Sequence, residues 1–211
     1  MRAAIDIGSN SVRLAMSDGT VTSEITKLAD GIERTGALSP AGVAATLDAL
    51  SAFAARCRGC ESVVAFATEA VRRASDGHEF IAQAKARTGL NIILLSPDDE
   101  ARLALFGAAK PNGAVTVCDL GGGSMEVISS ADGVSPEYAE SLQLGVVVLK
   151  NRYNGDYRAA IDEAPSLVAK FGKIKDYPLV LSGGSACAIA AGMLRQAVYD
   201  KTEIDGARFT A

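Results

Sequence analysis

Residues 4–14 read AIDIGSNSVRL, and residues 117–127 read VCDLGGGSMEV. The two stretches align without a gap at an offset of 113 residues (119 − 6), which sets Asp6 over Asp119. Each contains an apolar run, a carboxylate, a turn of small residues and a second strand-like run. An apolar run that ends at glycine or asparagine is typical of a buried strand entering a hairpin. The repeat therefore predicts two similar domains.

Both turns are suited to phosphate. Small residues let backbone N–H groups approach an anion, and a neighbouring carboxylate can hold a metal ion. The candidate phosphate contacts are Gly8, Ser9, Asn10 and Ser11 in the first turn and Gly121, Gly122, Gly123 and Ser124 in the second. A hairpin that merely needs small residues also explains the first turn. Three consecutive glycines, each costing about 1 kcal/mol of backbone entropy, favour close approach of a ligand at the second.

Two further features extend the pattern. Glu126 stands two residues after Ser124 on the same face of the following strand, where it either reaches a metal ion or a water or is a solvated strand residue. A third glycine turn, Gly183 and Gly184 followed by Ser185, lies between an apolar strand and a helical stretch. A helix N-terminus favours an anion, although a plain strand-to-helix turn also fits.

Between the repeats, residues 96–100 read SPDDE, a typical helix start with a serine cap and proline at the first position. A carboxylate in the first helical turn is stabilised in its ionised form by the helix dipole, so Glu100 is competent as a general base. Arg72 and Arg73 follow the end of a strand. They either bind phosphate or form a solvated basic pair.

The apolar spacing predicts two α/β domains, 1–112 and 113–211, separated by a Pro-Asn-Gly breaker at 111–113. Strands are expected at 3–8, 11–17, 21–28, 62–67 and 91–95, and again at 114–120, 124–130, 138–144 and 179–182. Helices are expected at 40–57, at 77–87, from 96 onward, at 145–153, at 157–173 and at 185–198. Ser39 and Pro40 mark the start of the first of these helices, and Gly89 is the stop signal of the second. This order favours mixed sheets flanked by helices. The second domain is expected to be incomplete at its C-terminal end, where Thr210 resembles the cap of a further helix.

Composition excludes several classes. A net charge of −4 gives no basic field for nucleic acid or a membrane surface. The sequence contains no apolar run of about 18 residues, so no transmembrane helix is expected. Asp6 stands where a signal peptide needs apolar residues, so we expect a cytoplasmic protein.

The Cys57 and Cys60 pair has the spacing of a redox or zinc motif. A helix end closed by Gly59 is the favoured interpretation.

Taken together, the motifs resemble the exopolyphosphatase/guanosine pentaphosphate phosphohydrolase (Ppx/GppA) family, within the actin-like (sugar kinase/Hsp70) ATPase superfamily. The segments that carry this resemblance are IDIGSNS at 5–11, ATEAVR at 67–72, DEARL at 99–103, DLGGGSME at 119–126 and SGGS at 182–185. They span nearly the whole chain in the family's order.

The resemblance implies two actin-like (ribonuclease H-like) domains with mixed five-stranded sheets and a site in the cleft between them. It implies release of the terminal phosphate of inorganic polyphosphate, or the 5′ phosphate of guanosine pentaphosphate, with Mg²⁺ and water. Matched by motif, Glu100 would be the general base. Asp119 and Glu126 would organise the metal or the water, with Asp6 as a further metal carboxylate and Arg72 facing the phosphates.

Two departures from the family pattern bear on these expectations. The family's Gly-Glu-Glu-Glu lead-in appears here as residues 96–99, SPDD. Family members also continue past Ala211 with helices and a fifth strand, and we therefore expect a shortened form, a short paralogue or half of a homodimer that completes the sheet. A non-catalytic nucleotide or polyphosphate sensor is the main alternative function. A sugar-kinase-like ATPase is weaker, because nothing in the sequence reads as a sugar pocket.

Overall fold

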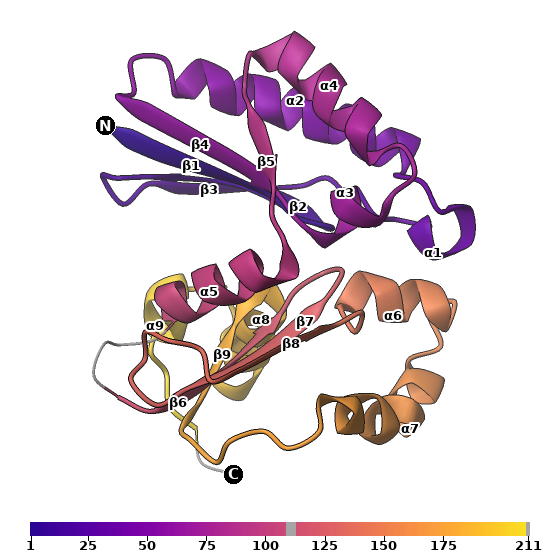
Figure 1. Ribbon diagram of the computed structural model, residues 1–211, viewed down its shortest axis with the longest axis vertical. Coiled ribbons are helices and arrows are strands. Elements are labelled where there is room, and N and C mark those ends of the chain that lie inside the picture. The colour runs from indigo at the N-terminus through magenta and orange to yellow at the C-terminus, as the bar shows by residue number, and fades with distance from the viewer. Residues whose placement is uncertain (109–112, 210–211) are drawn as a thin grey trace. The chain divides into compact units, whose positions relative to one another are not determined.

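The computed structural model of the chain describes residues 1–108 and 113–209. Two mixed sheets run through this part (Figure 1). The first has the order β3-β2-β1-β4-β5 and comprises β1 (Arg2–Ile7), β2 (Ser11–Met16), β3 (Val21–Ile25), β4 (Ser62–Ala67) and β5 (Ile92–Leu94). The second has the order β8-β7-β6-β9 and comprises β6 (Val115–Leu120), β7 (Met125–Ser130), β8 (Tyr138–Leu142) and β9 (Leu179–Ser182).

The two sheets repeat one topology. In the first, β1 pairs antiparallel with β2 and parallel with β4; in the second, β6 pairs antiparallel with β7 and parallel with β9. The expected pair of α/β domains with mixed sheets is therefore confirmed. The second sheet has four strands in the described part of the chain, where five were expected.

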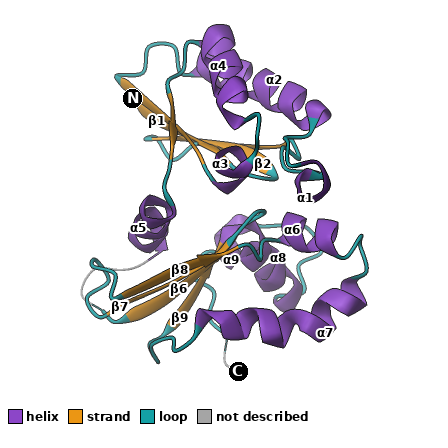
Figure 2. Ribbon diagram, turned by 45° about the vertical axis from the view of Figure 1, so that its right-hand side comes forward, coloured by secondary structure: helices purple, strands orange, loops and turns teal. Residues whose placement is uncertain are grey.

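Helices connect and flank the strands (Figure 2). They are α1 (Ile32–Thr35), α2 (Pro40–Arg56), α3 (Glu69–Arg73), α4 (Gly77–Thr88), α5 (Pro97–Ala108), α6 (Val146–Arg152), α7 (Tyr157–Val168), the 3-10 turn η1 (Ala169–Phe171), α8 (Gly183–Met193) and α9 (Lys201–Ile204). The predicted start of α2 is confirmed, because the Ser39 hydroxyl accepts a hydrogen bond from Gly42 N and Pro40 follows at the first position. The predicted stop of α4 at Gly89 is also confirmed, with a left-handed φ of 75°.

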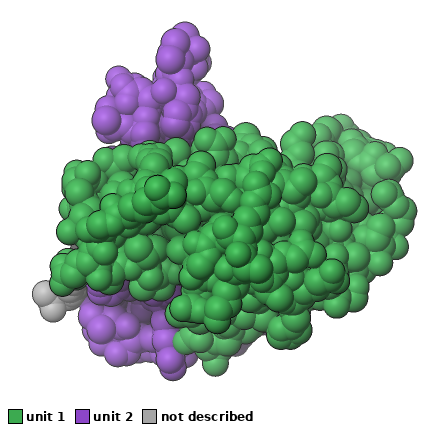
Figure 3. Space-filling view, turned by 90° about the horizontal axis from the view of Figure 1, so that it is seen from above, with its two compact units in different colours: residues 1–100, 122–124, 143–170 green, residues 101–121, 125–142, 171–211 purple. Residues whose placement is uncertain are grey.

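The chain forms two compact units, coloured separately in Figure 3. Unit 1 comprises Met1–Glu100, Gly122–Ser124 and Gln143–Lys170, and unit 2 holds the other described residues. The sheets follow the two halves of the sequence, but Gly122–Ser124 of the second glycine turn and the segment carrying α6 and α7 belong with unit 1. The two units therefore do not correspond to residues before and after a single boundary in the sequence. The predicted domain boundary at 112/113 adjoins residues 109–112, which lie outside the described residues, and it stays a prediction.

Each unit has its own core. In unit 1, α2 and α4 lie side by side on one face of the sheet, and Phe53 and Phe80 are buried there with Ile5. In unit 2, Leu105 of α5 packs against Val117 and Ile128 of the second sheet. Burial of this apolar surface is the main force that holds each sheet to its helices.

Several element bounds differ from those expected. Strand β3 ends at Ile25 instead of 28, because the N–H groups of Thr26 and Lys27 both turn to Asn10 O. Helix α7 ends at Val168 and continues only as the 3-10 turn, and α8 covers Gly183–Met193 where 185–198 was predicted. Helices α1, α3 and α9 were not predicted, since four or five residues are too few for a helical period to show. The proposed cap at Thr210 lies outside the described residues.

The cysteine motif is part of a helix end. Cys57 is the C-cap of α2, and Gly59 follows with φ 85°, as the structural interpretation predicted. Both Cys57 and Cys60 are free thiols. Across residues 1–108 and 113–209, no helix is both long and apolar enough to cross a membrane.

Candidate active site

The first turn is fixed by its own carbonyl groups. Gly8 N donates to Ser11 O at 3.0 Å, which closes the hairpin between β1 and β2. The carbonyls of Ser9 and Asn10 accept hydrogen bonds of 2.9–3.0 Å from backbone N–H groups within residues 26–29. The loop that follows β3 therefore holds the turn in one conformation. The four predicted phosphate contacts, Gly8–Ser11, all lie in this turn.

Gly122–Ser124 of the second turn belong to unit 1, where they pack against the first turn. A Cβ on Gly122 would lie 3.1 Å from Ser9 Cβ and 3.3 Å from Asn10 N. A Cβ on Gly123 would lie only 2.5 Å from Ser9 Oγ and 2.2 Å from Glu69 Oε2. Close approach, rather than a left-handed backbone, is thus what requires glycine here. The structure brings the two predicted phosphate turns into contact.

Helix α6 fastens the second turn. Its N-cap Gly145 donates to Gly123 O at 3.2 Å, and Val147 N donates to Gly122 O at 2.8 Å. These N–H groups belong to the unpaired set at a helix N-terminus, and the glycine carbonyls satisfy them. A Cβ on Gly145 would come within 2.3 Å of Gly122 O, so the helix start must also be glycine.

Arg72 and Glu100, two predicted site residues, bind each other. Arg72 Nη1 donates to Glu100 Oε2 at 2.7 Å and to Leu95 O at 2.6 Å. The two side chains are 26% and 14% exposed, so the interpretation of Arg72 as a solvated residue is wrong. Glu100 lies in a well-defined helix start, where Ser96 Oγ accepts from Asp99 N at 3.2 Å. The ion pair to Arg72 therefore holds the side chain of the candidate base, and the Ser96 cap fixes the helix turn that carries it.

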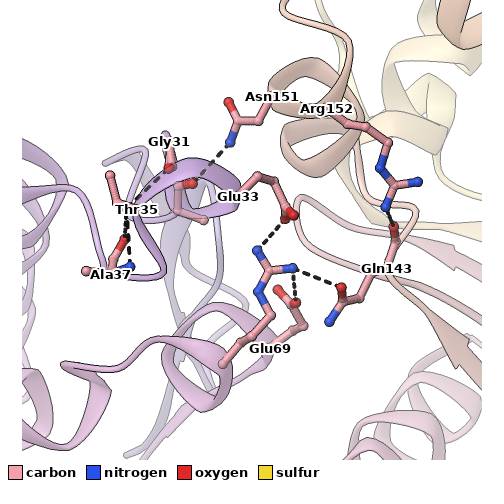
Figure 4. Close-up of polar contacts among 10 residues, drawn as sticks. Gly31, Glu33, Thr35, Ala37, Glu69, Gln143, Asn151 and Arg152 are labelled. Carbon is pink, nitrogen blue, oxygen red and sulfur yellow. Dashed lines mark hydrogen bonds and ion pairs between the residues drawn. The ribbon is translucent and has the colours of Figure 1, made fainter.

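Arg73 is also engaged rather than solvated, and Figure 4 labels three residues that it contacts, Glu33, Glu69 and Gln143. Its guanidinium pairs with Glu33 of α1, lies 3.3 Å from Glu69 Oε1, and donates to Gln143 Oε1 at 3.0 Å. Asn151 Nδ2 adds a 3.4 Å hydrogen bond to the carbonyl of residue 29. These contacts tie the 143–170 segment to the rest of unit 1.

Glu69 is a site residue that sequence reasoning missed. It opens α3 directly after β4, its side chain is only 7% exposed, and its carboxylate lies against Gly123. Burial raises the pKa of Glu69 above its ordinary value and Glu33 adds to this, while Arg73 and Arg72 lower it. The only sequence signal was its place in the ATEAVR segment, where it reads as an acidic first-turn residue.

Unit 2 holds the candidate metal carboxylates. Asp119 on β6 is the direct cross-strand partner of Glu126 on β7, so both side chains lie on one face of the sheet. Glu126 is 5% exposed, and Ser141 Oγ donates to its Oε1 at 2.7 Å. The interpretation of Glu126 as a solvated strand residue is therefore wrong.

The charge of this pair distinguishes the two repeats. In the first repeat Asp6 faces Arg13 across the hairpin, whereas in the second Asp119 faces Glu126. Two carboxylates directly opposite each other repel unless a cation lies between them. The negative charge also acts on Cys118: burial, followed by Asp119 and Glu126, raises the pKa of its thiol to about 11.

This donor set fits Mg²⁺. The ion prefers oxygen ligands and is usually held by one or two carboxylates together with water and substrate phosphate. Asp119 and Glu126 provide such a pair. Within the described residues no group of three or more acidic, histidine or cysteine side chains is placed to hold a metal by itself. Asp6 stays a predicted ligand.

The third glycine turn lies against the carboxylate of Asp119. Gly183 begins α8 with φ 88°, and a Cβ there would lie 2.6 Å from Asp119 Oδ1. The positive end of the α8 dipole therefore faces a carboxylate of the protein itself. Gly184 and Ser185 form the same first turn. Their role as phosphate contacts stays a prediction.

A groove of about 290 Å³ lies elsewhere on unit 2. Side chains of β6, β7 and β9 line it together with Ile174, Lys175 and Tyr177, and the predicted site residues do not contribute. It is therefore not part of the candidate active site.

Duplicated Asp-turn hairpins on two mixed α/β sheets define a protein of the actin-like fold class. More specifically, the chain belongs to the Ppx/GppA phosphatase family, whose sequence model matches residues 9–170. It is 31% identical over 156 residues to exopolyphosphatase 1 of Mycobacterium tuberculosis, covering 67% of this chain and 45% of that protein. It is 30% identical to a putative exopolyphosphatase of Haemophilus influenzae, covering 73% and 51%. The chain thus spans about half the length of these curated relatives.

Solved structures agree with this assignment. The Ppx/GppA enzyme of Aquifex aeolicus is 31% identical and superposes with a TM-score of 0.74 over 96% of this chain and 74% of that one. An exopolyphosphatase-like protein superposes with a TM-score of 0.88 over 99% of this chain and 74% of that one. At 24% identity, the latter supports the fold alone.

Proposed function

We propose that this protein is a Mg²⁺-dependent phosphoanhydride hydrolase that releases the terminal phosphate of inorganic polyphosphate or the 5′ phosphate of guanosine pentaphosphate. The observation that carries the proposal is the Arg72–Glu100 pair at 2.7 Å, in the same compact unit as the two glycine-serine turns. A fixed carboxylate and two phosphate turns are among the parts that phosphoryl transfer to water requires, together with a metal ion. The similarity to proteins named exopolyphosphatase supports the same substrate class.

In this proposal the two turns bind the terminal phosphate through backbone N–H groups and the hydroxyls of Ser9 and Ser124. Glu100 accepts a proton from a water molecule, and the water oxygen attacks the terminal phosphorus. The bond from that phosphorus to the bridging oxygen breaks, which releases phosphate and a chain shortened by one unit. In the proposal Arg72 orients Glu100 and also pairs with phosphate charge. Most of the rate enhancement then comes from positioning and charge stabilisation.

Asp119 and Glu126 would hold Mg²⁺, with Asp6 as a proposed further ligand. When bound, the ion would neutralise the charge that develops on the phosphate oxygens. The Ser141 hydroxyl orients Glu126, and the start of α8 stabilises the negative charge of Asp119.

A phosphate-release assay on the purified protein tests the proposal. Polyphosphate and guanosine pentaphosphate are each supplied with Mg²⁺ and, in parallel, with excess EDTA. Release from at least one substrate that stops with EDTA is the expected result. Binding of either compound without release would instead support the non-catalytic sensor.

A further inference from the structure

Glu69 lies at the contact between the two phosphate turns. The point where a Cβ of Gly123 would stand is 2.2 Å from Glu69 Oε2 and 2.5 Å from Ser9 Oγ. The carboxyl group therefore touches the backbone of the second turn and lies close to a side chain of the first. Both contacts are inside unit 1.

This carboxyl group is buried without adequate partners. Its side chain is 7% exposed, and neither oxygen has a hydrogen-bond donor among the described residues. Arg73 Nη1, at 3.3 Å from Oε1, is its closest counter-charge, and that guanidinium also serves Glu33 and Gln143. A buried polar group without partners is costly, and it commonly marks a functional site.

The charge state of Glu69 bears directly on phosphate binding. The charged groups that act on it are Arg73 and Arg72 of its own helix and Glu33 of α1. An ionised carboxylate at the turns would repel phosphate, because like charges interact strongly in a poorly solvated site. A neutral carboxyl group removes this repulsion, and its O–H can donate to an oxygen of the bound anion.

We propose that Glu69 is a positioning residue whose carboxyl group is neutral when phosphate occupies the two turns, so that phosphate binding is coupled to uptake of a proton from solvent wherever Glu69 is ionised in the free protein. The proposal rests on the proposed role of the turns as phosphate contacts. It makes substrate affinity sensitive to pH through a residue that takes no part in the chemical step.

The test measures binding without turnover. All proteins carry Glu100→Gln, and tripolyphosphate with Mg²⁺ is the probe in titration calorimetry between pH 5.5 and 8.5. Two buffers of different ionisation enthalpy report the proton uptake. Because the protonation of tripolyphosphate itself is common to all variants, differences between variants isolate Glu69. Glu69→Gln is the neutral isostere, and Glu69→Ala replaces it if the former does not fold.

We expect the protein with Glu69 to take up more protons on binding than the Glu69→Gln variant. The affinity of the Gln variant relative to the Glu protein should rise with pH by up to about tenfold per pH unit. Glu33→Gln is the matched control: it should retain the proton uptake, with its midpoint at lower pH, because Glu33 raises the pKa of Glu69.

Equal pH dependence of affinity with Glu and Gln at position 69 would overturn the inference. If the wild-type protein also releases phosphate, the proposed hydrolase would stand while this inference fails. If binding is proton-linked but the wild-type protein releases no phosphate, the hydrolase would fail and the inference would stand. Absence of tripolyphosphate binding in every variant would overturn the inference together with the role of the turns.

Discussion

Arg72 Nη1 lies 2.7 Å from Glu100 Oε2 and donates a second hydrogen bond to the carbonyl of Leu95. The two residues come from helices that follow β4 and β5, which are parallel neighbours. Because the carboxyl ends of parallel strands meet at one sheet edge, this pair forms where open α/β sheets bind ligands. The arginine orients the candidate base.

Arg72→Lys tests the orienting role. Lysine retains the charge but lacks the planar guanidinium whose Nη1 bonds both Glu100 Oε2 and Leu95 O, so Glu100 should be less well fixed. We expect kcat for polyphosphate to fall by roughly tenfold or more, with a smaller change in KM. Arg58→Lys, at an exposed position, is the control. Unchanged kcat in Arg72→Lys would show that Arg72 does not position the base.

Gly123→Ala tests the contact between the turns. The added Cβ would lie 2.2 Å from Glu69 Oε2, so we expect a loss of about 1–3 kcal/mol in the free energy of unfolding and weaker phosphate binding. The matched control is Gly192→Ala in α8, where a Cβ meets nothing within 4 Å. That substitution should stabilise by roughly 0.5–1 kcal/mol. Urea unfolding measures the free energy of unfolding of both variants. A change of the same sign in both would contradict the close contact between Gly123 and Glu69.

Glu126→Gln tests the metal pair. It keeps the shape and the hydrogen-bonding capacity beside Ser141 but removes one of two facing negative charges. The Mg²⁺ concentration for half-maximal phosphate release should rise by about tenfold or more. Glu24→Gln, which removes an exposed carboxylate on β3, is the control. An unchanged Mg²⁺ requirement in Glu126→Gln would remove this residue from the metal site.

Glu69 also predicts a dependence of stability on pH. Its pKa in the folded protein is raised above the ordinary value of 4.5, chiefly by burial, so the folded state binds this proton more tightly than the unfolded state does. Its contribution to the free energy of unfolding is fully present below 4.5 and is lost as pH rises through the folded pKa.

Unfolding by urea at successive pH values measures this effect. The free energy of unfolding of the wild type relative to Glu69→Gln should decline as pH rises from 4.5 through the folded pKa of Glu69, and should then level off. Glu79→Gln removes an exposed carboxylate of the same unit and serves as the control. A wild-type stability that rises relative to Glu69→Gln across the window would contradict the direction of the shift.

Local signals account for what the sequence predicted well. The apolar runs around Asp6 and Asp119 end in glycine-rich turns, and this pattern predicts both hairpins and the presence of two similar mixed sheets. Ser39 and Gly89 likewise mark helix ends through interactions within a few residues. These features depend on neighbours in the chain, so a single sequence reveals them.

What the sequence missed depends on distant contacts. Glu69 is buried by the backbone of Gly123, 54 residues away (123 − 69), and nothing in its own segment distinguishes it from an exposed helix-start acid. Arg72 and Glu100 were both predicted as site residues, but not their ion pair. The placement of residues 143–170 in unit 1 follows from the contacts of Gln143 and Gly145, which no periodicity encodes.

Phosphate release by wild type and Glu100→Gln is the most direct measurement of the proposed chemistry. With Mg²⁺ and polyphosphate or guanosine pentaphosphate, Glu100→Gln should lower kcat by about 10²–10⁴-fold while tripolyphosphate binding persists, because the variant loses only the proton acceptor. Asp98→Asn, an exposed acid in the same helical turn, should retain wild-type release. Release by Glu100→Gln at the wild-type rate would show that Glu100 is not the base.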